Sequence, residues 1–128
     1  MSKKLKKCIF CNIPKSRIIS SNELAVVIKD NYPVTKHHCL IIPKRHCVDY
    51  FDLYQPEINA ITQLINQTKK ELVKKDKSIK GFNIGNNSGE VAGQTIFHCH
   101  IHLIPRRKDD VENPRGGVRR VIPSKQNY

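Results

Sequence analysis

The sequence predicts an α+β fold in which one long helix packs against a sheet of short strands. Three observations carry this prediction: residues 52–75 repeat apolar side chains at the helical period, short apolar runs end at turn residues, and residues 97–105 alternate at the strand period of two. The chain has 128 residues, which fits one domain. A domain of this size buries roughly two-thirds of its unfolded surface and folds without disulfide bonds.

Four short strands are expected before the last one. Their ranges are 18–20, 24–29, 39–42 and 81–85. The first two are expected to form a hairpin, because only Ser21-Asn22-Glu23 separates them. The third stops at Pro43, which has no N–H to donate to a neighbouring strand.

A single long helix is expected from Asp52 to about Lys75. Asp52 and Gln55 resemble a capping box, and Pro56 suits the first turn of a helix. The positions expected to face the sheet form one stripe: Ile58, Ile61, Leu64, Ile65, Thr68 and Leu72. Lys74 and Lys75 suit the C-terminal end, where cations interact favourably with the helix dipole.

Three histidines mark the last strand. His98, His100 and His102 are two residues apart, so a strand would place their side chains on one face. Imidazole acts as a nucleophile, a base or a metal ligand, and three imidazoles on one face are costly as packing. All six histidines fall within residues 37–46 and 98–102. This distribution indicates a functional site.

The charge favours an anionic partner. Lys and Arg number 23 against 11 Asp and Glu, which gives a formal net charge of +12. Phosphorylated small molecules, RNA or an acidic protein would fit this charge. Nucleic acid is not indicated, because the basic runs near the two ends lack interleaved aromatic residues that could stack on bases.

Hydropathy and cysteine content indicate the cellular compartment in which the protein is expected. No apolar run approaches the roughly 18 residues of a membrane-spanning helix, and residues 1–7 lead into no secretory apolar core. We therefore expect a cytoplasmic protein with no membrane partner. Five cysteines, an odd number, are expected there as thiols or metal ligands.

Cys8-Ile9-Phe10-Cys11 is a C-x-x-C motif with three interpretations: a zinc knuckle, a redox dithiol, or no function. A redox motif normally sits where a strand passes into the helix of a βαβ unit, and no such unit follows. A zinc site needs two more ligands.

The segment from Asn86 to Gly93 is polar and contains glycine. Such a loop can offer backbone N–H groups to a phosphate, although most such stretches are turns. It leads directly into the histidine strand. After Pro105 no strong period appears, and residues 113–117 are expected to be an irregular arm.

The segment from His98 to Ile104 resembles the signature of the histidine triad family, His-φ-His-φ-His-φ-φ with φ apolar, and Cys99 is a mild departure. Other segments stand in the family's order and spacing: residues 8–11, Asp30 before Pro33, residues 38–46, and Gly93-Gln94-Thr95. The resemblance covers about residues 8–107, which we take as the domain. Residues 1–7 are then a basic N-terminal tail and residues 108–128 a basic C-terminal arm.

The resemblance implies a fold and a chemistry. The fold is a five-stranded antiparallel sheet with one long and one short helix, paired into a homodimer with a continuous sheet. The chemistry is hydrolysis or transfer at the α-phosphate of a nucleotide through a covalent nucleotidyl-histidine, here on His100. A hydrogen bond to a backbone carbonyl is expected to fix the His100 tautomer. His102 and His38 support the site, and Thr95 with the Gly93 backbone binds the α-phosphate.

The resemblance also implies a nucleoside pocket for adenine or another purine. Asp30 matches the acidic residue that accepts hydrogen bonds from the ribose hydroxyls, and Asn87 lies near the ribose and phosphate. The residues matching the walls of the base pocket are Ile9, Phe10, Ile13 and Ile28. Asn31 replaces an apolar residue common in relatives, which leaves the base preference open.

A structural zinc ion is the expected cofactor. The resemblance supplies the ligands missing from the C-x-x-C motif, so that the set is Cys8, Cys11, His46 and His98. The competing interpretation is an empty pair of thiols beside hydrogen-bonded histidines. The remaining cysteines are expected as small core residues: Cys39, Cys47 and Cys99.

The expected substrates are dinucleoside polyphosphates such as diadenosine tetraphosphate. The chain lacks the tryptophan-bearing tail of many phosphoramidases, and residues 110–122 resemble bacterial proteins labelled dinucleoside polyphosphate hydrolases. Arginines in that arm could neutralise a polyphosphate. A purine mononucleotide phosphoramidase is the alternative. A nucleotide-binding or interaction protein with incidental catalysis is a further one.

Overall fold

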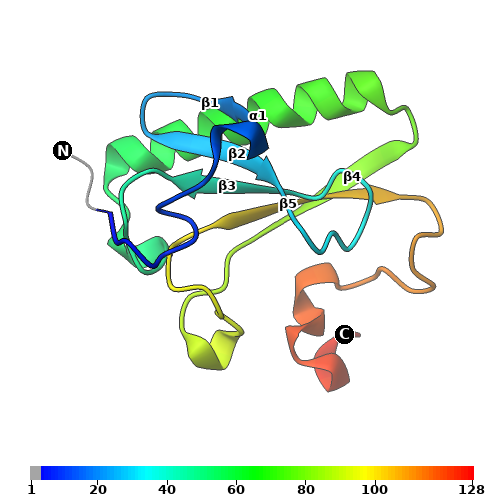
Figure 1. Cartoon of the computed structure of the whole chain (residues 1–128). Helices are drawn as coiled ribbons and strands as arrows, with labels where there is room; N and C mark the ends of the chain where they lie inside the picture. Colours follow the sequence, from blue (N-terminus) through cyan, green and yellow to red (C-terminus); the bar gives the residue numbers. More distant parts are fainter. Residues whose placement is uncertain (1–3) are drawn as a thin grey trace.

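A computed structural model describes residues 4–128 (Figure 1). The strands are β1 (Ile18–Ser21), β2 (Ala25–Lys29), β3 (Cys39–Pro43), β4 (Ile79–Gly85) and β5 (Ile101–Arg107), and the long helix is α1 (Gln55–Lys75). All neighbouring strands pair antiparallel in one sheet, in the order β1-β2-β3-β5-β4. The predicted α+β fold and five-stranded antiparallel sheet are confirmed. Within residues 4–128 the remaining helical segments are 3₁₀ turns, so the expected short helix takes that form.

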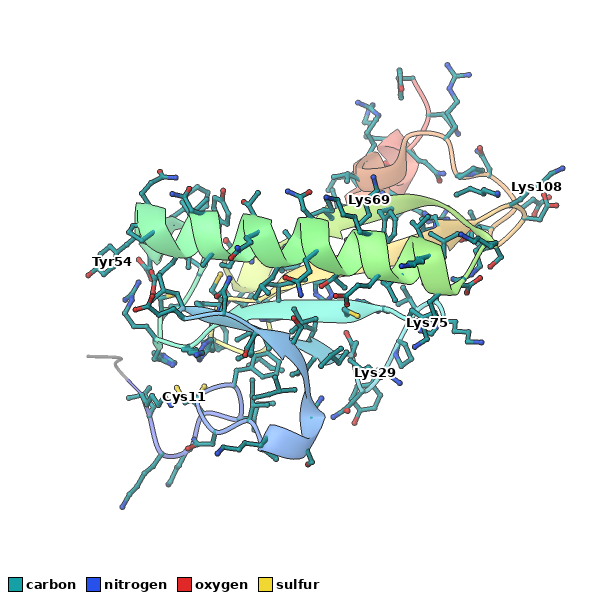
Figure 2. All side chains as sticks on the ribbon, turned by 90° about the horizontal axis from the view of Figure 1, so that it is seen from above. Cys11, Lys29, Tyr54, Lys69, Lys75 and Lys108 are labelled. Atoms are coloured by element: carbon teal, nitrogen blue, oxygen red, sulfur yellow. The ribbon has the colours of Figure 1, made fainter. Side chains whose placement is uncertain are left out.

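The main core lies between α1 and one face of the sheet. Ile61, Leu64 and Leu72 from the predicted stripe are buried there. Lys69 and Lys75 lie on exposed parts of the helix (Figure 2). The three cysteines expected in the core are buried in the same cluster: Cys39, Cys47 and Cys99.

The predicted start of the helix is wrong. Asp52 ends a separate 3₁₀ turn, Tyr50–Asp52, and α1 begins at Gln55. The carboxylate of Glu57, not Gln55, reaches back and accepts a hydrogen bond from the Tyr54 N–H at 2.8 Å. The same carboxylate binds Arg45, so the helix start is tied to the loop that follows β3.

The predicted histidine strand is shorter than expected. β5 begins at Ile101, which faces Ile41 of β3, so His98 and His100 precede the strand. The Cys99 N–H instead donates to the Cys47 carbonyl at 2.8 Å. This long-range bond binds the segment to the loop after β3 and keeps it ordered outside the sheet.

The second face of the sheet carries the two chain ends. Phe10, from the N-terminal segment, packs into a buried cluster with Val26 and Ile28 of β2 and Leu40 and Ile42 of β3. The C-terminal arm lies below β4 and β5, on the side of the sheet away from α1 (Figure 1). Among residues 4–128 no helix has the length and apolar character needed to cross a membrane.

Both ends make specific contacts. The Asn12 amide donates to the carbonyls of Leu5, Lys6 and Cys8, so part of the predicted N-terminal tail is bound to the C-x-x-C turn. Residues 1–3 of that tail lie outside the described part of the chain. In the arm, the buried Gln126 amide donates to the carbonyls of Asn113 and Arg115, which folds residues 113–126 into one unit.

Candidate functional site

The His100 ring is held in one tautomer. Its Nδ1 lies 2.9 Å from the His98 carbonyl oxygen, which can only accept, so Nδ1 carries the proton. Nε2 then carries a lone pair. The Phe10 ring packs edge-on against His100, with 5.1 Å between ring centroids. An imidazole with a fixed orientation and an available lone pair is a competent nucleophile.

A second chain of hydrogen bonds fixes the other two imidazoles. The Val34 N–H donates to Nδ1 of His38 at 3.1 Å, so the proton of neutral His38 lies on Nε2. This Nε2 is 2.9 Å from Nδ1 of His102 and donates to it. The proton of neutral His102 is therefore on its own Nε2. His102 thus presents an N–H donor beside the nucleophile, at 5.3 Å between the His100 and His102 ring centroids.

The electrostatics keep this pair neutral. Burial lowers the pKa of His102 to about 4, and the neighbouring His100 and His38 add to the effect against the opposing charge of Asp30. Burial also lowers the pKa of His38, again opposed by Asp30. The Asp30 Oδ2 lies 3.4 Å from Nε2 of His38 and 3.8 Å from Nδ1 of His102. Near neutral pH both imidazoles therefore act as hydrogen-bonding groups, with His102 as a donor.

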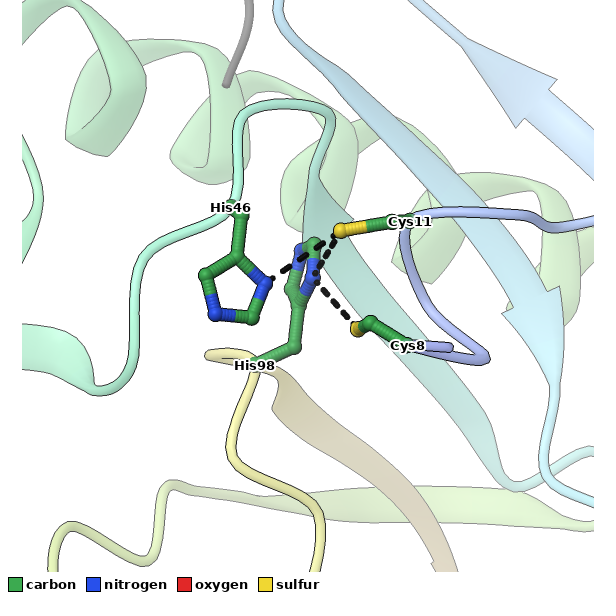
Figure 3. A group of neighbouring side chains, drawn as sticks. All are labelled: Cys8, Cys11, His46 and His98. Atoms are coloured by element: carbon green, nitrogen blue, oxygen red, sulfur yellow. Dashed lines mark hydrogen bonds between the residues drawn. The ribbon is translucent and has the colours of Figure 1, made fainter. Parts of the chain in front are cut away.

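Four predicted metal ligands converge on one point (Figure 3). Their ligand atoms, from Cys8, Cys11, His46 and His98, all lie within 4.8 Å of one another. Nδ1 of His98 is 3.3 Å from the Cys8 Sγ and 3.5 Å from the Cys11 Sγ, and Nδ1 of His46 is 3.2 Å from the Cys11 Sγ. Tetrahedral zinc with ordinary bond lengths separates N and S ligands by about 3.6 Å. The four residues fit a closed structural zinc site.

The protonation of His98 also fits a metal ligand. Its Nε2 lies 2.8 Å from the Pro43 carbonyl oxygen and must donate to it, which leaves the Nδ1 lone pair facing the sulfurs. Asp30, His38 and His102 form a second group of potential ligands. That group fails the same test: a metal on Nε2 of His38 would require a proton on Nδ1, where the Val34 N–H already points. Of these two groups, the first alone has a donor set that fits a metal ion.

A cavity of about 370 Å³ opens above the histidines. Nine of the predicted site residues line it: Ile9, Phe10, Asp30, His38, Asn87, Gly93, Thr95, His100 and His102. They come from the N-terminal segment, the residue after β2, the residue before β3, the loop after β4, the segment leading into β5, and β5 itself. Pairing of β3 with both β2 and β5 brings these distant segments together.

Hydrogen bonds from a buried side chain fix the conformation of the loop between β4 and β5. The buried Gln94 side chain accepts from the Gly89 N–H at 2.9 Å and donates to the carbonyls of Val48 and Ile96. Asn86 donates to the His100 carbonyl at 3.0 Å. Gly93 has φ of 97°, a left-handed conformation that glycine adopts without strain. The loop therefore presents its backbone and Thr95 to the cavity in a defined shape.

Comparison with known proteins places the chain in a family. A family model described as the HIT domain matches residues 12–109, more than half of the chain. The chain belongs to the histidine triad (HIT) family. An uncharacterized HIT-like protein of Mycoplasma genitalium is 39% identical over 103 residues, which cover 77% of this chain and 72% of that protein.

Two further HIT relatives carry informative names. A crystal structure of a zinc-bound histidine triad family protein from Mycobacterium smegmatis is 31% identical, with a TM-score of 0.74 over 84% of this chain and 80% of that chain. The adenylylsulfatase HINT3 of Arabidopsis thaliana is 33% identical over 107 residues, which cover 80% of this chain and 54% of that enzyme. The HIT family thus includes hydrolases, and a neighbour of this chain binds zinc.

Two residues expected in the base pocket of this HIT protein lie elsewhere. Ile28 is fully buried in the cluster around Phe10, and Ile13 packs against that cluster; neither lines the cavity. Sequence reasoning gave no role to Arg17, which lines the cavity and donates to the Asn31 side chain at 3.0 Å. No local motif could have found Arg17, because the antiparallel pairing of β1 with β2 brings it to Asn31.

Proposed function

We propose that this HIT protein hydrolyses nucleotides at the α-phosphate through a covalent nucleotidyl intermediate on His100, with dinucleoside polyphosphates such as diadenosine tetraphosphate as substrates. One observation carries the proposal. The His98 carbonyl fixes the proton of His100 on Nδ1, and the opposite nitrogen belongs to a ring that lines the cavity. A pure binding module has no need of a nucleophile held in this way.

The chemistry proceeds in two displacements at phosphorus. Nε2 of His100 attacks the α-phosphorus, an N–P bond forms, and the P–O bond to the leaving group breaks. The leaving oxygen takes the bonding electron pair and departs as a phosphate anion. Water then attacks the α-phosphorus, the N–P bond breaks, and one water proton passes to solvent. The products are a nucleoside monophosphate and neutral His100.

The neighbouring groups stabilise charge on the phosphate. The Nε2–H of His102 donates to a phosphate oxygen, and His38 holds His102 in the tautomer that makes this possible. Thr95 and the backbone of Gly93, in the loop between β4 and β5, contribute further hydrogen bonds to the phosphate. Because His102 is neutral near pH 7, it stabilises the transition state by a directed hydrogen bond.

The nucleoside lies at the other end of the cavity. Asp30 accepts hydrogen bonds from the ribose hydroxyls, since a carboxylate offers only acceptors. Its Oδ1 already accepts from the Tyr32 N–H at 2.8 Å, which fixes the carboxylate plane. Ile9 and Phe10 provide an apolar wall for the base, here taken as a purine.

A structural zinc ion, when bound by Cys8, Cys11, His46 and His98, would cross-link separate segments of the chain. It would join the C-x-x-C turn to the loop after β3 and to His98. Because Phe10 lies inside that turn, the cross-link positions one wall of the nucleotide cavity. The cysteine ligands require a reducing compartment, so we also propose a cytoplasmic location.

A mononucleotide phosphoramidase is the second candidate, and the C-terminal arm favours it. Arg106, near the end of β5, is held by two hydrogen bonds to Asp110 of the arm, both at 2.8 Å. Arg119 donates to the Lys125 carbonyl, and Arg120 donates to Gln126. Arginines engaged in this way are less available to a polyphosphate. In the phosphoramidase reaction a P–N bond breaks in place of the P–O bond, and the amine departs with a proton from solvent.

We also propose a homodimer whose sheet continues through β4. β4 is an edge strand of seven residues, whereas β1, at the other edge, has four and an irregular register. Its register with β5 is regular from Gly81 to Gly85, and the longer edge suits antiparallel pairing with a second copy. Sedimentation equilibrium should give twice the 14.7 kDa chain mass. A monomer at micromolar concentration would contradict the dimer.

Turnover of diadenosine tetraphosphate and of adenosine 5′-phosphoramidate should be measured side by side with wild type and His100→Ala. The proposal expects hydrolysis by wild type and a loss of about 10⁴-fold or more in the variant. A preference of about a hundredfold, near 2.7 kcal/mol, would identify the substrate branch. Undiminished hydrolysis in His100→Ala would exclude the covalent mechanism.

A further inference from the structure

Two polar residues that line the nucleotide cavity have no role in the proposed reaction. They are Arg17 and Asn31, which are hydrogen-bonded to each other at 3.0 Å. Asn31 directly follows Asp30, the residue proposed to bind the ribose. A nucleotide with its phosphate at His100 and its ribose on Asp30 extends its base beyond Asp30, toward Asn31 and the Arg17 bonded to it.

The Arg17 guanidinium is fixed through one of its nitrogens. Nη2 donates to the Lys29 carbonyl at 3.2 Å and to Oδ1 of Asn31 at 3.0 Å, which uses both hydrogens of this nitrogen. Within residues 4–128, Nη1 and Nε of Arg17 make no further hydrogen bond. Their N–H groups lie in one rigid plane. Arg17 therefore lines the cavity with donors that a ligand can use.

The same hydrogen bond orients the Asn31 amide. Arg17 can only donate, so the atom that faces it is the amide oxygen, and Nδ2 lies at the other end of the amide. Nδ2 is also a donor. The pair of side chains therefore offers mainly N–H groups to a ligand.

The positive charge of Arg17 is not neutralised by a carboxylate. None of the ion pairs found among residues 4–128 includes Arg17. Asp30, which lines the same cavity, faces His38 and His102 instead, at 3.4 Å and 3.8 Å. Acceptor atoms of a ligand are therefore favoured beside Arg17, and donor groups are disfavoured.

Guanine and adenine differ in the groups that such donors would meet. One edge of guanine carries the acceptors O6 and N7, whereas adenine has an amino group in place of O6. Arginine pairs with both guanine acceptors at once, which is the commonest specific contact between a side chain and a base. Against adenine, an N–H of Arg17 would face another N–H and lose its hydration without gaining a partner. Hypoxanthine carries the same O6 and N7 as guanine.

We propose that Arg17, oriented by Asn31, binds O6 and N7 of the base and makes the protein selective for nucleotides of the 6-oxopurines, guanine and hypoxanthine, over those of adenine. This inference rests on the proposed function for the placement of the phosphate and ribose. Among dinucleoside polyphosphates, those of guanosine are then the preferred substrates, and diadenosine tetraphosphate is a weaker one.

The test measures the binding of nucleoside monophosphates by calorimetry, which requires no turnover. The ligands are GMP, IMP, AMP and 7-deaza-GMP, in which carbon replaces N7. Arg17→Met keeps a long side chain but removes its donors. Lys15→Met is the matched control, because Lys15 carries the same charge, is exposed in the same 3₁₀ turn, Lys15–Arg17, and does not line the cavity. Melting temperatures show whether each variant is folded.

Wild type should bind GMP and IMP about tenfold tighter than AMP, and 7-deaza-GMP more weakly than GMP. Arg17→Met should bind GMP and IMP no tighter than AMP, whereas Lys15→Met should keep the wild-type preference. Equal affinity of wild type for GMP and AMP, or IMP bound as weakly as AMP, would overturn the inference, and neither result depends on a variant that folds. An equal loss of affinity for GMP and AMP in Arg17→Met would also overturn it, because Arg17 would then act without distinguishing the bases.

Kinetic measurements separate this inference from the proposed function. In wild type, kcat/KM for diguanosine tetraphosphate should exceed that for diadenosine tetraphosphate about tenfold, and in Arg17→Met the two values should be equal. Selective binding of GMP without turnover of either compound, or of a nucleoside phosphoramidate, would overturn the proposed function alone. Turnover that depends on His100 and is equal for the two bases would overturn the base selectivity alone.

Discussion

Replacing one of the four proposed zinc ligands should loosen one wall of the proposed nucleotide cavity, and Cys11→Ser tests this. Cys11 is buried, and its sulfur contacts the Nδ1 atoms of both His46 and His98. It also belongs to the turn that carries Phe10, whose ring packs on His98 and His100. Loss of the metal therefore acts on stability and on nucleotide binding together.

The expected magnitude follows from ligand linkage. A ligand present at a thousand times its dissociation constant stabilises the native state by about 4 kcal/mol. For a chain of this length that corresponds to a fall in Tm of about 15 °C when zinc is lost. We expect KM for the nucleotide to rise about tenfold, because the wall formed by Ile9 and Phe10 is no longer held, while kcat changes little.

The assay combines three measurements on protein purified without chelator: zinc per chain by mass spectrometry, Tm with and without EDTA, and steady-state kinetics. Cys39→Ala is the control, because it removes a buried thiol from the core on the other side of the sheet. Wild type should contain one zinc per chain and Cys11→Ser none. A wild-type protein without zinc, or a Cys11→Ser variant with unchanged Tm and KM, would refute the reasoning.

Three further predictions concern charge and protonation. Arg45→Met should lower the free energy of unfolding by about 3–5 kcal/mol in urea titrations, because Glu57 is 4% exposed and would lose its ion-pair partner. The double variant Arg45→Met with Glu57→Leu should recover part of this loss. Equal stability of the single and double variants would contradict this reasoning. The pKa of His102 is about 4 in the folded state, whereas an unfolded histidine binds a proton near pH 6.5, so part of the free energy of unfolding present above pH 6.5 should be lost as the pH falls toward 4. His102→Gln should show a smaller loss. An identical dependence of the free energy of unfolding on pH in wild type and His102→Gln would exclude this assignment. Asp30→Asn should raise KM about tenfold for a ribonucleotide and leave KM for a 2′,3′-dideoxynucleotide unchanged, and an equal rise for both would argue against ribose recognition.

Local patterns were sufficient for the elements of the fold. The stripe of α1 and the apolar runs of β2 and β3 are buried as their periods predicted, since each element places one face or both against the core. The helix start was missed because Glu57 takes part in two interactions, one of them with Arg45 from a distant loop. Long-range pairing of this kind leaves no periodic signal.

The sequence points to the candidate site most clearly where one residue type recurs at a fixed spacing. The alternation of His98, His100 and His102 predicts a reactive site, and His100 and His102 line the cavity. The different hydrogen bonds of His98 and His102 could not be predicted from the sequence, because each depends on a backbone group of a distant segment. The Pro43 carbonyl accepts from His98. The Val34 N–H donates to His38, which in turn donates to His102.

The most direct test of the central claim is to trap the intermediate. Wild type is mixed with diadenosine tetraphosphate, quenched in denaturant at alkaline pH within one turnover, and analysed by peptide mass spectrometry. The account predicts a nucleotidyl group on the peptide containing His100, absent from His100→Ala. A nucleotidyl group on a different residue, or turnover by His100→Ala at the wild-type rate, would contradict it.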